Sequence, residues 1–176
     1  AVMAANLALK LGVPSKIALR VAKNFCGLEH RLEFIRKTDR VRFYNDSAST
    51  NPETSAAAIH AFPHELKILI AGGQDKNLDY QPLARAIKNS DTRLVVLFGE
   101  NKKKIEKAIK KSSVSIKITS NLKNALVIAY KSAIKLSTTH YPLPTNIIFY
   151  PGSASFDMFQ NYEDRGEQFK KLVKRL

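Results

Sequence analysis

The stretch YNDSASTNPETSAAAI, Tyr44–Ile59, begins as a β-strand, passes through a polar turn and continues as an alanine-rich helix. The end of the turn is typical of a helix start, with Asn51 as N-cap, Pro52 in the first turn and Glu53 beside it. Capping accounts for Asn51 but not for the hydroxyl of Thr50 or the carboxylate of Asp46. An Asx-turn is the alternative interpretation of Asp46. We treat this corner as a candidate ligand site.

The alternation of strand and helix patterns continues on both sides of this stretch. Upstream, two alternating apolar runs flank the residues KTDR at 37–40 and predict a β-hairpin. Downstream, four short runs rich in β-branched and aromatic residues predict strands at 67–71, 93–98, 115–118 and 146–150, and helical patterns lie at 80–89, 101–111 and 121–136. The chain is therefore predicted to be α/β and Rossmann-like, with a mostly parallel sheet flanked by helices and an N-terminal hairpin.

Polar residues follow several of the predicted strands. Tyr44 is followed by NDSAST, Ala71 by GGQDKNLD, Phe98 by GEN and Tyr150 by PGSAS. Open α/β sheets bind ligands outside the carboxyl ends of their strands, so we expect a polar or anionic ligand there. The sequence contains neither G-x-G-x-x-G nor G-x-x-x-x-G-K-[ST], and thus has no recognisable ATP-phosphate loop.

Composition sets further bounds. The 176 residues suit one domain of ordinary size, with or without an appended piece, and the single Cys26 excludes an internal disulfide or a cysteine-based zinc cluster. No apolar run approaches the ~18–20 residues of a membrane span, and we expect a cytoplasmic protein. The first residues, 1–25, form a helical pattern without a cap, so we expect that the chain was cut from something longer, at or inside a helix.

The formal charge of +14 attracts polyanions in general. Lysine and arginine cluster in NKKKIEKAIKK at 101–111 and in RGEQFKKLVKRL at 165–176. Apolar residues recur on one face of each predicted helix, and neither cluster has interleaved aromatic residues. We therefore interpret both clusters as solvated helix faces rather than a nucleic-acid surface.

Four stretches, taken together, resemble the C-terminal domain of the Mur ligases, and most of all the branch that adds D-glutamate. They are GLEHRLEF at 27–34, YNDSASTNPE at 44–53, AGGQDKNLDY at 71–80 and SASFDMFQNYEDRGEQF at 153–169. The resemblance implies that residues 1–27 are the end of a central ATP-binding domain and the hinge, and that residues 28–176 are the Rossmann-like C-terminal Mur ligase domain.

The resemblance also implies an activity. ATP, with Mg²⁺, phosphorylates the carboxylate of UDP-MurNAc-L-alanine, and D-glutamate attacks the acyl phosphate to form an amide in peptidoglycan synthesis. ATP and Mg²⁺ are bound mainly by the central domain. This chain would be inactive alone, and we expect a monomer with neither membrane nor nucleic-acid partners.

Residue roles carry over at matching positions. The resemblance places Arg31 and Asp46 toward the nucleotide, and it places five residues around the amino acid: Thr50, Lys76, Ser155, Phe156 and Tyr162. It assigns no catalytic residue and no metal ligand. The alternatives are a surface Arg31, a solvated Lys76, a helix-capping Ser155 and two core aromatic residues, and His30 is expected to serve packing or hydrogen bonding.

Two stretches depart from the family pattern: YPGSAS at 150–155 differs from the SPACAS of many relatives, and position 48 lacks a cation. The motif usually has lysine where this chain has Ala48, and Lys37, Arg40 or Arg42 are candidates to compensate for the missing cation. A related ligase for another amino acid and a non-catalytic polyanion-binding domain are the alternative functions.

Overall fold

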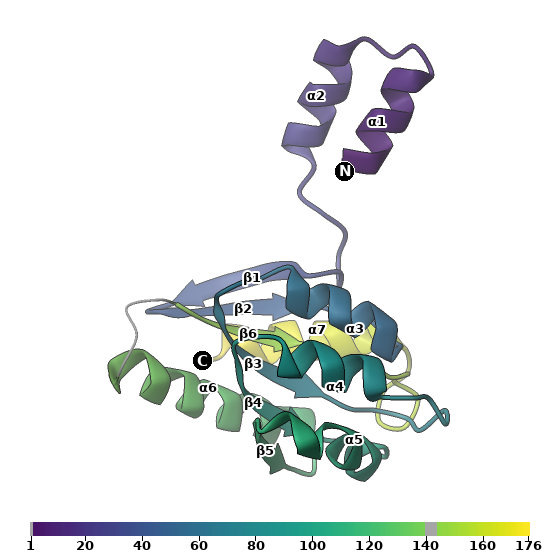
Figure 1. The fold of residues 1–176 in the computed structure, drawn as a ribbon. Coiled ribbons are helices and arrows are strands. Elements are labelled where there is room, and N and C mark those ends of the chain that lie inside the picture. Colours follow the sequence, from purple (N-terminus) through teal and green to yellow (C-terminus); the bar gives the residue numbers. More distant parts are fainter. Residues whose placement is uncertain (1, 140–143) are drawn as a thin grey trace.

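The computed structural model describes residues 2–139 and 144–176 and contains one six-stranded sheet (Figure 1). The strands are β1 (Glu33–Thr38), β2 (Val41–Asn45), β3 (Leu66–Ala71), β4 (Thr92–Leu97), β5 (Ser115–Ile118) and β6 (Thr145–Phe149). Their order across the sheet is β1-β2-β6-β3-β4-β5, and every pairing is parallel except that of β1 with β2. The predicted hairpin and the mostly parallel sheet are confirmed.

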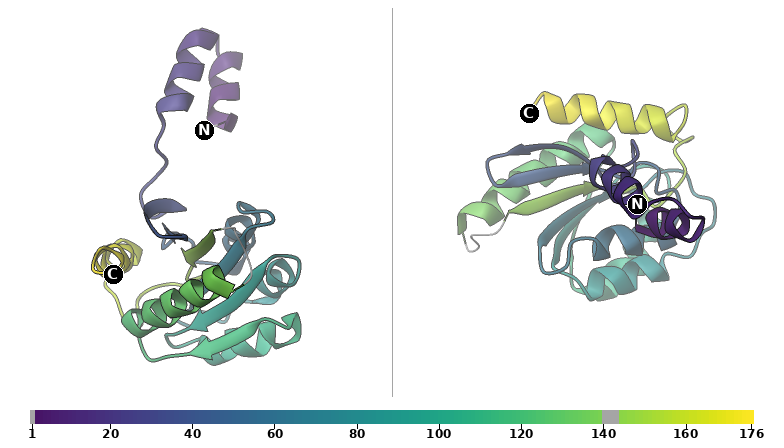
Figure 2. Two further views of the ribbon diagram at one scale, coloured as in Figure 1. Left: turned by 90° about the vertical axis from the view of Figure 1, so that its left-hand side faces the viewer. Right: turned by 90° about the horizontal axis from the view of Figure 1, so that it is seen from above.

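Helices cover both faces of the sheet, as the two views of Figure 2 show. One face packs against α3 (Pro52–His60), α4 (Gln81–Lys88) and α5 (Lys102–Ile109), and the other packs against α6 (Leu122–Thr139) and α7 (Tyr162–Lys174). Successive residues of a strand point to opposite faces. In β3, for example, Ile68 and Ile70 join the α6–α7 side, whereas Leu69 joins the α3–α5 side.

The amino end of the sheet is held by its own polar contacts. Glu65 accepts hydrogen bonds from Arg42 Nη1 at 2.9 Å and from Asn146 Nδ2 at 3.0 Å. Arg42 is therefore engaged away from the carboxyl ends of the strands, and Lys37 and Arg40 lie at or beside the β1–β2 turn, at that same end. The expectation that one of these three cations substitutes for the lysine absent at Ala48 is wrong.

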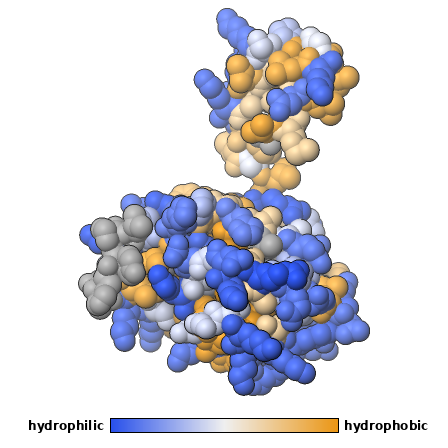
Figure 3. Space-filling model, in the orientation of Figure 1, coloured by the Kyte–Doolittle hydropathy of each residue, from blue (hydrophilic) through white to orange (hydrophobic). Residues whose placement is uncertain are grey.

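Two further helices, α1 (Val2–Lys10) and α2 (Ser15–Asn24), form a hairpin that stands apart from the sheet on a linker (Figures 1 and 2). No residue of α1 is buried, and Ala18 is the buried residue of α2. Figure 3 shows hydrophobic residues across much of the hairpin, whereas the sheet domain is largely hydrophilic on the same face. Within the described residues, no helix combines the length and apolarity needed to cross a membrane.

Candidate functional site

Four loops meet at the carboxyl ends of β2, β3, β4 and β6, and we call them the loop floor (residues 46–51, 72–80, 99–101 and 150–157). Their backbones are joined to one another. Gly72 N donates to Pro151 O at 2.9 Å, Gln74 N to Ala154 O at 2.9 Å and Gly152 N to Ser49 O at 3.0 Å. These bonds fix the spacing of the loops before any ligand arrives, because the loops bond to each other rather than to water.

Asn101 is a buried hub of the loop floor. Its Oδ1 accepts a hydrogen bond from Gly73 N at 2.9 Å, and its Nδ2 donates to Tyr80 Oη and Ser153 Oγ, each at 2.5 Å. Tyr80 Oη and Ser153 Oγ are 3.2 Å apart, so the three side chains form one network. Burial raises the pKa of the Tyr80 phenol, which keeps it protonated. Asn101 thus connects the loops after β3, β4 and β6.

The double glycine in this floor has a steric cause. Gly72 has φ +124°, and a Cβ there would collide with the carbonyl of Phe98. A Cβ at Gly73 would likewise collide with the carbonyl oxygen of Ala154. Only glycine lets the backbone after β3 pass this close to its neighbours.

Arg165 is fully buried and joins two of the loops from α7. Its Nε and Nη2 donate to Oγ and O of Ser47, at 3.0 and 2.9 Å, and its Nη1 donates to Ser153 O at 3.0 Å. Burial lowers the pKa of the guanidinium to about 9, although the charge of Asp157 opposes that shift. The side chain therefore sets the distance between the loop that carries Thr50 and the loop that carries Ser155.

Both carboxylate oxygens of Asp46 are engaged within the chain. Oδ1 accepts from Leu32 N at 3.0 Å, and Oδ2 accepts from the hydroxyl of Ser49 at 2.5 Å. Burial raises the pKa of Asp46, while these two hydrogen bonds and the charge of Arg31 lower it. The contact with Leu32 spans fourteen positions, so Asp46 makes a tertiary link to the start of the sheet domain rather than a local Asx-turn.

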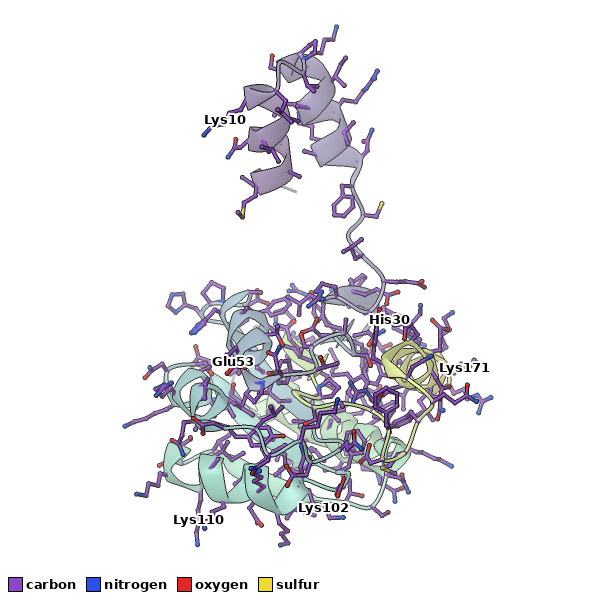
Figure 4. All side chains as sticks on the ribbon, turned by 90° about the vertical axis from the view of Figure 1, so that its right-hand side faces the viewer. Lys10, His30, Glu53, Lys102, Lys110 and Lys171 are labelled. Carbon is purple, nitrogen blue, oxygen red and sulfur yellow. The ribbon has the colours of Figure 1, made fainter. Side chains whose placement is uncertain are left out.

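Arg31 is exposed at that start, and its neighbours have strained backbones. His30 has φ +59° and Leu32 has φ +45°, values that L-residues rarely adopt. His30 is buried, and its Nδ1 lies 2.9 Å from Asn45 Nδ2. Figure 4 shows His30 where the linker meets the sheet domain, close to the helix that bears Lys171. We call residues 29–33 the pivot, and the contact of His30 with Asn45 helps to hold its conformation.

Charged residues surround the pivot. Lys170 Nζ lies 2.7 Å from both Glu29 Oε1 and Glu167 Oε1, and 3.2 Å from Glu33 Oε1. Within the described residues, Glu29, His30 and Glu167 are close enough together to hold a metal ion. Glu29 and Glu167 already pair with the ammonium of Lys170, which offsets part of the negative charge of the group. The expectation of packing or hydrogen bonding by His30 agrees with these contacts.

The residues predicted to bind the amino acid fall in two places. Lys76 is exposed, and its Nζ lies 5.7 Å from the centroid of the Phe156 ring, which is 62% exposed. Ser155 is buried beside Phe156, and its hydroxyl has no hydrogen-bond partner within the described residues. The bridge between Gln74 and Ala154 brings these two loops together.

Thr50 and Tyr162 lie elsewhere on the same side. Thr50 is half-buried in the loop after β2, between Ser49 and the N-cap Asn51, whose Oδ1 accepts from Thr54 N at 2.9 Å. Tyr162 begins α7, and its ring lies edge-on to His30 with the centroids 6.2 Å apart. Tyr162 therefore lies beside the pivot rather than against Lys76 and Phe156, and its predicted contact with the amino acid stays a prediction.

Comparison with known proteins identifies the fold and the family. Residues 30–137 match the family model described as Mur ligase, glutamate ligase domain. A UDP-N-acetylmuramoylalanine–D-glutamate ligase from Aquifex aeolicus is 38% identical over 171 residues, which cover 97% of this chain and 39% of that protein. One from Acetivibrio thermocellus is 36% identical over 179 residues, covering 97% and 36%. The chain thus spans about a third of the length of these relatives.

Solved structures share the fold at low sequence identity. UDP-N-acetylmuramate-alanine ligase from Thermotoga maritima superposes with a TM-score of 0.60 at 15% identity, over 97% of this chain and 36% of its own. A folylpolyglutamate synthase from Mycobacterium tuberculosis, complexed with ADP, has a TM-score of 0.64 at 16% identity, over 89% and 35%. The family model covers more than half of the 176 residues. The chain therefore belongs to the Mur ligase family, through its glutamate ligase domain.

Proposed function

We propose that this chain is the amino-acid-binding part of an ATP-dependent ligase that joins D-glutamate to UDP-MurNAc-L-alanine. The sequence relatives support the choice of amino acid, since they are named as D-glutamate ligases. The enzyme would act in the cytoplasm, as a monomer, in peptidoglycan synthesis. Residues 28–176 form the domain that holds D-glutamate, and residues 1–27 are the end of the preceding domain and the hinge.

The observation that carries the proposal is the meeting of Lys76, Ser155 and Phe156 on the loop floor. An exposed ammonium, and the hydroxyl of a buried serine that has no hydrogen-bond partner among the described residues, suit the carboxylates of an amino acid. In water an exposed ion pair with Lys76 contributes at most about 1 kcal/mol. Closure against the preceding domain would exclude water and strengthen it, because the same charges attract more strongly at lower dielectric.

Each residue has a defined task in this proposal. Lys76 pairs with one carboxylate of D-glutamate, and Ser155 donates its hydroxyl to the other. Thr50 hydrogen-bonds the amino acid from the loop after β2, while Phe156 and Tyr162 border the site. The amino group is thereby directed toward the activated carboxylate of the second substrate. This chain would thus accelerate the reaction by orienting the amino acid rather than by acid–base chemistry.

ATP and Mg²⁺ would be held mainly outside this chain. The sequence has no phosphate loop, and both oxygens of Asp46 are already hydrogen-bonded. The described residues thus do not form a complete nucleotide site, and Asp46 would serve the nucleotide by fixing the position of the pivot. Arg31 is the group free to approach a phosphate, because its exposed guanidinium is a strong anion donor. Bound Mg²⁺ would screen the phosphate charges.

The test uses the full-length ligase that contains this chain. ADP release is followed with ATP, Mg²⁺ and UDP-MurNAc-L-alanine, with and without D-glutamate. Lys76→Ala should raise the KM for D-glutamate strongly, by about tenfold or more, because one ion pair with a carboxylate is lost. Lys103→Ala is the matched control. Lys103 is exposed on α5, where it pairs with Glu106, and its loss should leave the KM unchanged. An unchanged KM in Lys76→Ala would remove Lys76 from the site.

A panel of amino acids tests the alternative. The fold is shared with ligases that act on different substrates, so architecture alone does not select the amino acid. Turnover that requires D-glutamate, and is absent with L-glutamate or D-aspartate, supports the proposal and shows that Ala48 is tolerated. Turnover with another amino acid would move the assignment to a related ligase.

A further inference from the structure

A hollow of about 480 Å³ lies between α4 and α5, on the helical layer next to the loop floor. Five cationic side chains line it: Arg85 and Lys88 from α4, and Lys104, Lys107 and Lys111 from α5 and the turn that follows it. We call this hollow the cationic groove. Figure 3 shows that much of this side of the molecule is hydrophilic.

The spacing of these residues explains why they converge. Arg85 and Lys88 are three positions apart, and Lys104, Lys107 and Lys111 follow at intervals of three and four, so each set lies on one helix face. Small residues, Ala84 and Ala108, lie between the two rows and leave the space unfilled. Each helix surface alone looks like an ordinary solvated face. Together they place positive charges on both sides of one hollow.

The charges in the groove are poorly balanced. Asp79 is the single acidic residue among the groove-lining residues, against five cations. Arg85, Lys88, Lys107 and Lys111 have no ion pair within the described residues, whereas Lys103, on the outer face of the same helix, pairs with Glu106 at 3.1 Å. Like charges gathered around a concave surface raise the local potential and attract anions.

We propose that the cationic groove binds a small multivalent anion of the oligophosphate or phosphate-ester class. The volume of the hollow lies within the ~300–1,000 Å³ of small-molecule sites. It is too small for a docked helix, because α4 has only eight residues, about 12 Å of wall. Tyr80 is the single aromatic residue among the groove-lining residues and is buried, so the lining does not resemble the stacked aromatic platform of a single-strand nucleic-acid site.

Lys104 connects this groove to the loop that carries Lys76. Its Nζ donates to Asp75 Oδ1 at 3.1 Å and to Asn77 Oδ1 at 2.8 Å, and Asn77 N donates to Asp75 Oδ1 at 2.8 Å. These contacts hold the residues on both sides of Lys76. An anion in the groove competes for the ammonium of Lys104 and so loosens the loop, which couples the groove to the proposed amino-acid site.

The test measures binding of inorganic triphosphate, without metal, to the 176-residue chain by isothermal titration calorimetry at about 100 mM salt, where distant charges are screened. Lys107→Ala/Lys111→Ala should weaken binding by about tenfold or more, as two charge-assisted contacts are lost. Lys103→Ala/Lys110→Ala is the matched control, with the same charge change on the same segment outside the groove, and should change affinity less than about twofold.

Several results would overturn the proposal. Absence of binding would show that the groove is not an anion site. An equal loss in both double variants would mean general attraction to a +14 chain rather than a site. Tighter groove-dependent binding of polyglutamate or single-stranded DNA would make the groove a surface for a macromolecule instead. These measurements use no ligase reaction, so their outcome is independent of the proposed function.

Amide NMR signals test the coupling to the Lys76 loop. The signals of Asp75, Lys76 and Asn77 should shift as triphosphate is added, with the same affinity as the calorimetric binding. They should stay unchanged in Lys107→Ala/Lys111→Ala at the same concentrations. Groove-dependent binding that leaves these three signals in place would refute the coupling through Lys104.

Discussion

The loop floor and the α1–α2 hairpin differ in how far their side chains find partners inside this chain. The loop floor buries Asn101, Ser153 and the contacts of Arg165, and each of these polar side chains finds partners inside the chain. The hairpin leaves Leu11 and Val21 more than half exposed, and an apolar hollow of about 270 Å³ lies between its helices. The side chains that join the floor thus find their partners within this chain, whereas the hairpin has apolar surface left uncovered, as expected if it is the end of a preceding domain.

Arg165→Met is the most severe test of the internal contacts that join the floor. The change leaves the buried carbonyls of Ser47 and Ser153 without donors, at about 1–3 kcal/mol each, and relieves the burial of a charge. We expect the free energy of unfolding in urea to fall by about 3 kcal/mol. Arg175→Met, on an exposed residue at the end of the same helix, should change it by less than about 0.5 kcal/mol.

A loss below about 1 kcal/mol in Arg165→Met would contradict the comparison, because the loops would then be held by contacts other than the guanidinium. The charge itself can be separated from the contacts. Arg165→Lys keeps a cation but has one donor group in place of a fork, so it should recover only part of the stability.

Asn101→Ala should have the next largest effect. It leaves Gly73 N without an acceptor and removes a donor from the hydroxyls of Tyr80 and Ser153. We expect about 2 kcal/mol less stability in urea, and faster hydrogen exchange of the amides of residues 73–80. Asn124→Ala, an exposed asparagine of α6, is the control. Unchanged exchange in the 73–80 loop would show that Asn101 is not its anchor.

The pivot lies between the two regions, and Lys170→Met tests how much the ion pairs around it contribute to stability. Three carboxylates lose their common cation, so we expect about 1 kcal/mol less stability at neutral pH, a value typical of a partly exposed ion-pair network. Lys171→Met is the control, since Lys171 is exposed and has no ion pair within the described residues.

The pH dependence of this difference has a definite sign. Hydrogen bonding to Lys170 lowers the pKa of Glu29, so that contribution is present above the unfolded pKa and is lost as the pH falls through the folded one. Burial alone would lower the pKa of Lys170, but the hydrogen bonds that its ammonium donates to three glutamates raise it, so the pairing persists up to alkaline pH. The gap between wild type and Lys170→Met should therefore shrink on acidification, and a gap that widens would refute the network.

Periodicity is enough to predict the strands and the hairpin, and the residues Asn51-Pro52-Glu53 are enough to predict the cap, because each depends on residues close together in the chain. Arg165 was missed, although it lies on the stripe it shares with Phe169 and Val173, where a charged residue signals an internal partner. Asn101 looked like an ordinary helix start, and its partners come from loops distant in sequence. The cationic groove depends on the pairing of α4 with α5, which a single helix pattern does not reveal.

Deleting the hairpin should have the smallest effect of all. A chain that begins at Phe25 keeps the linker, the pivot and the whole sheet domain, and α1 and α2 contribute no residue to either hydrophobic core of that domain. We expect the free energy of unfolding to change by less than about 0.5 kcal/mol, with less self-association in sedimentation because exposed apolar surface is removed. A loss above about 1 kcal/mol would mean that the hairpin packs on the domain in solution, and the distinction between an internally joined floor and an uncovered hairpin would fail.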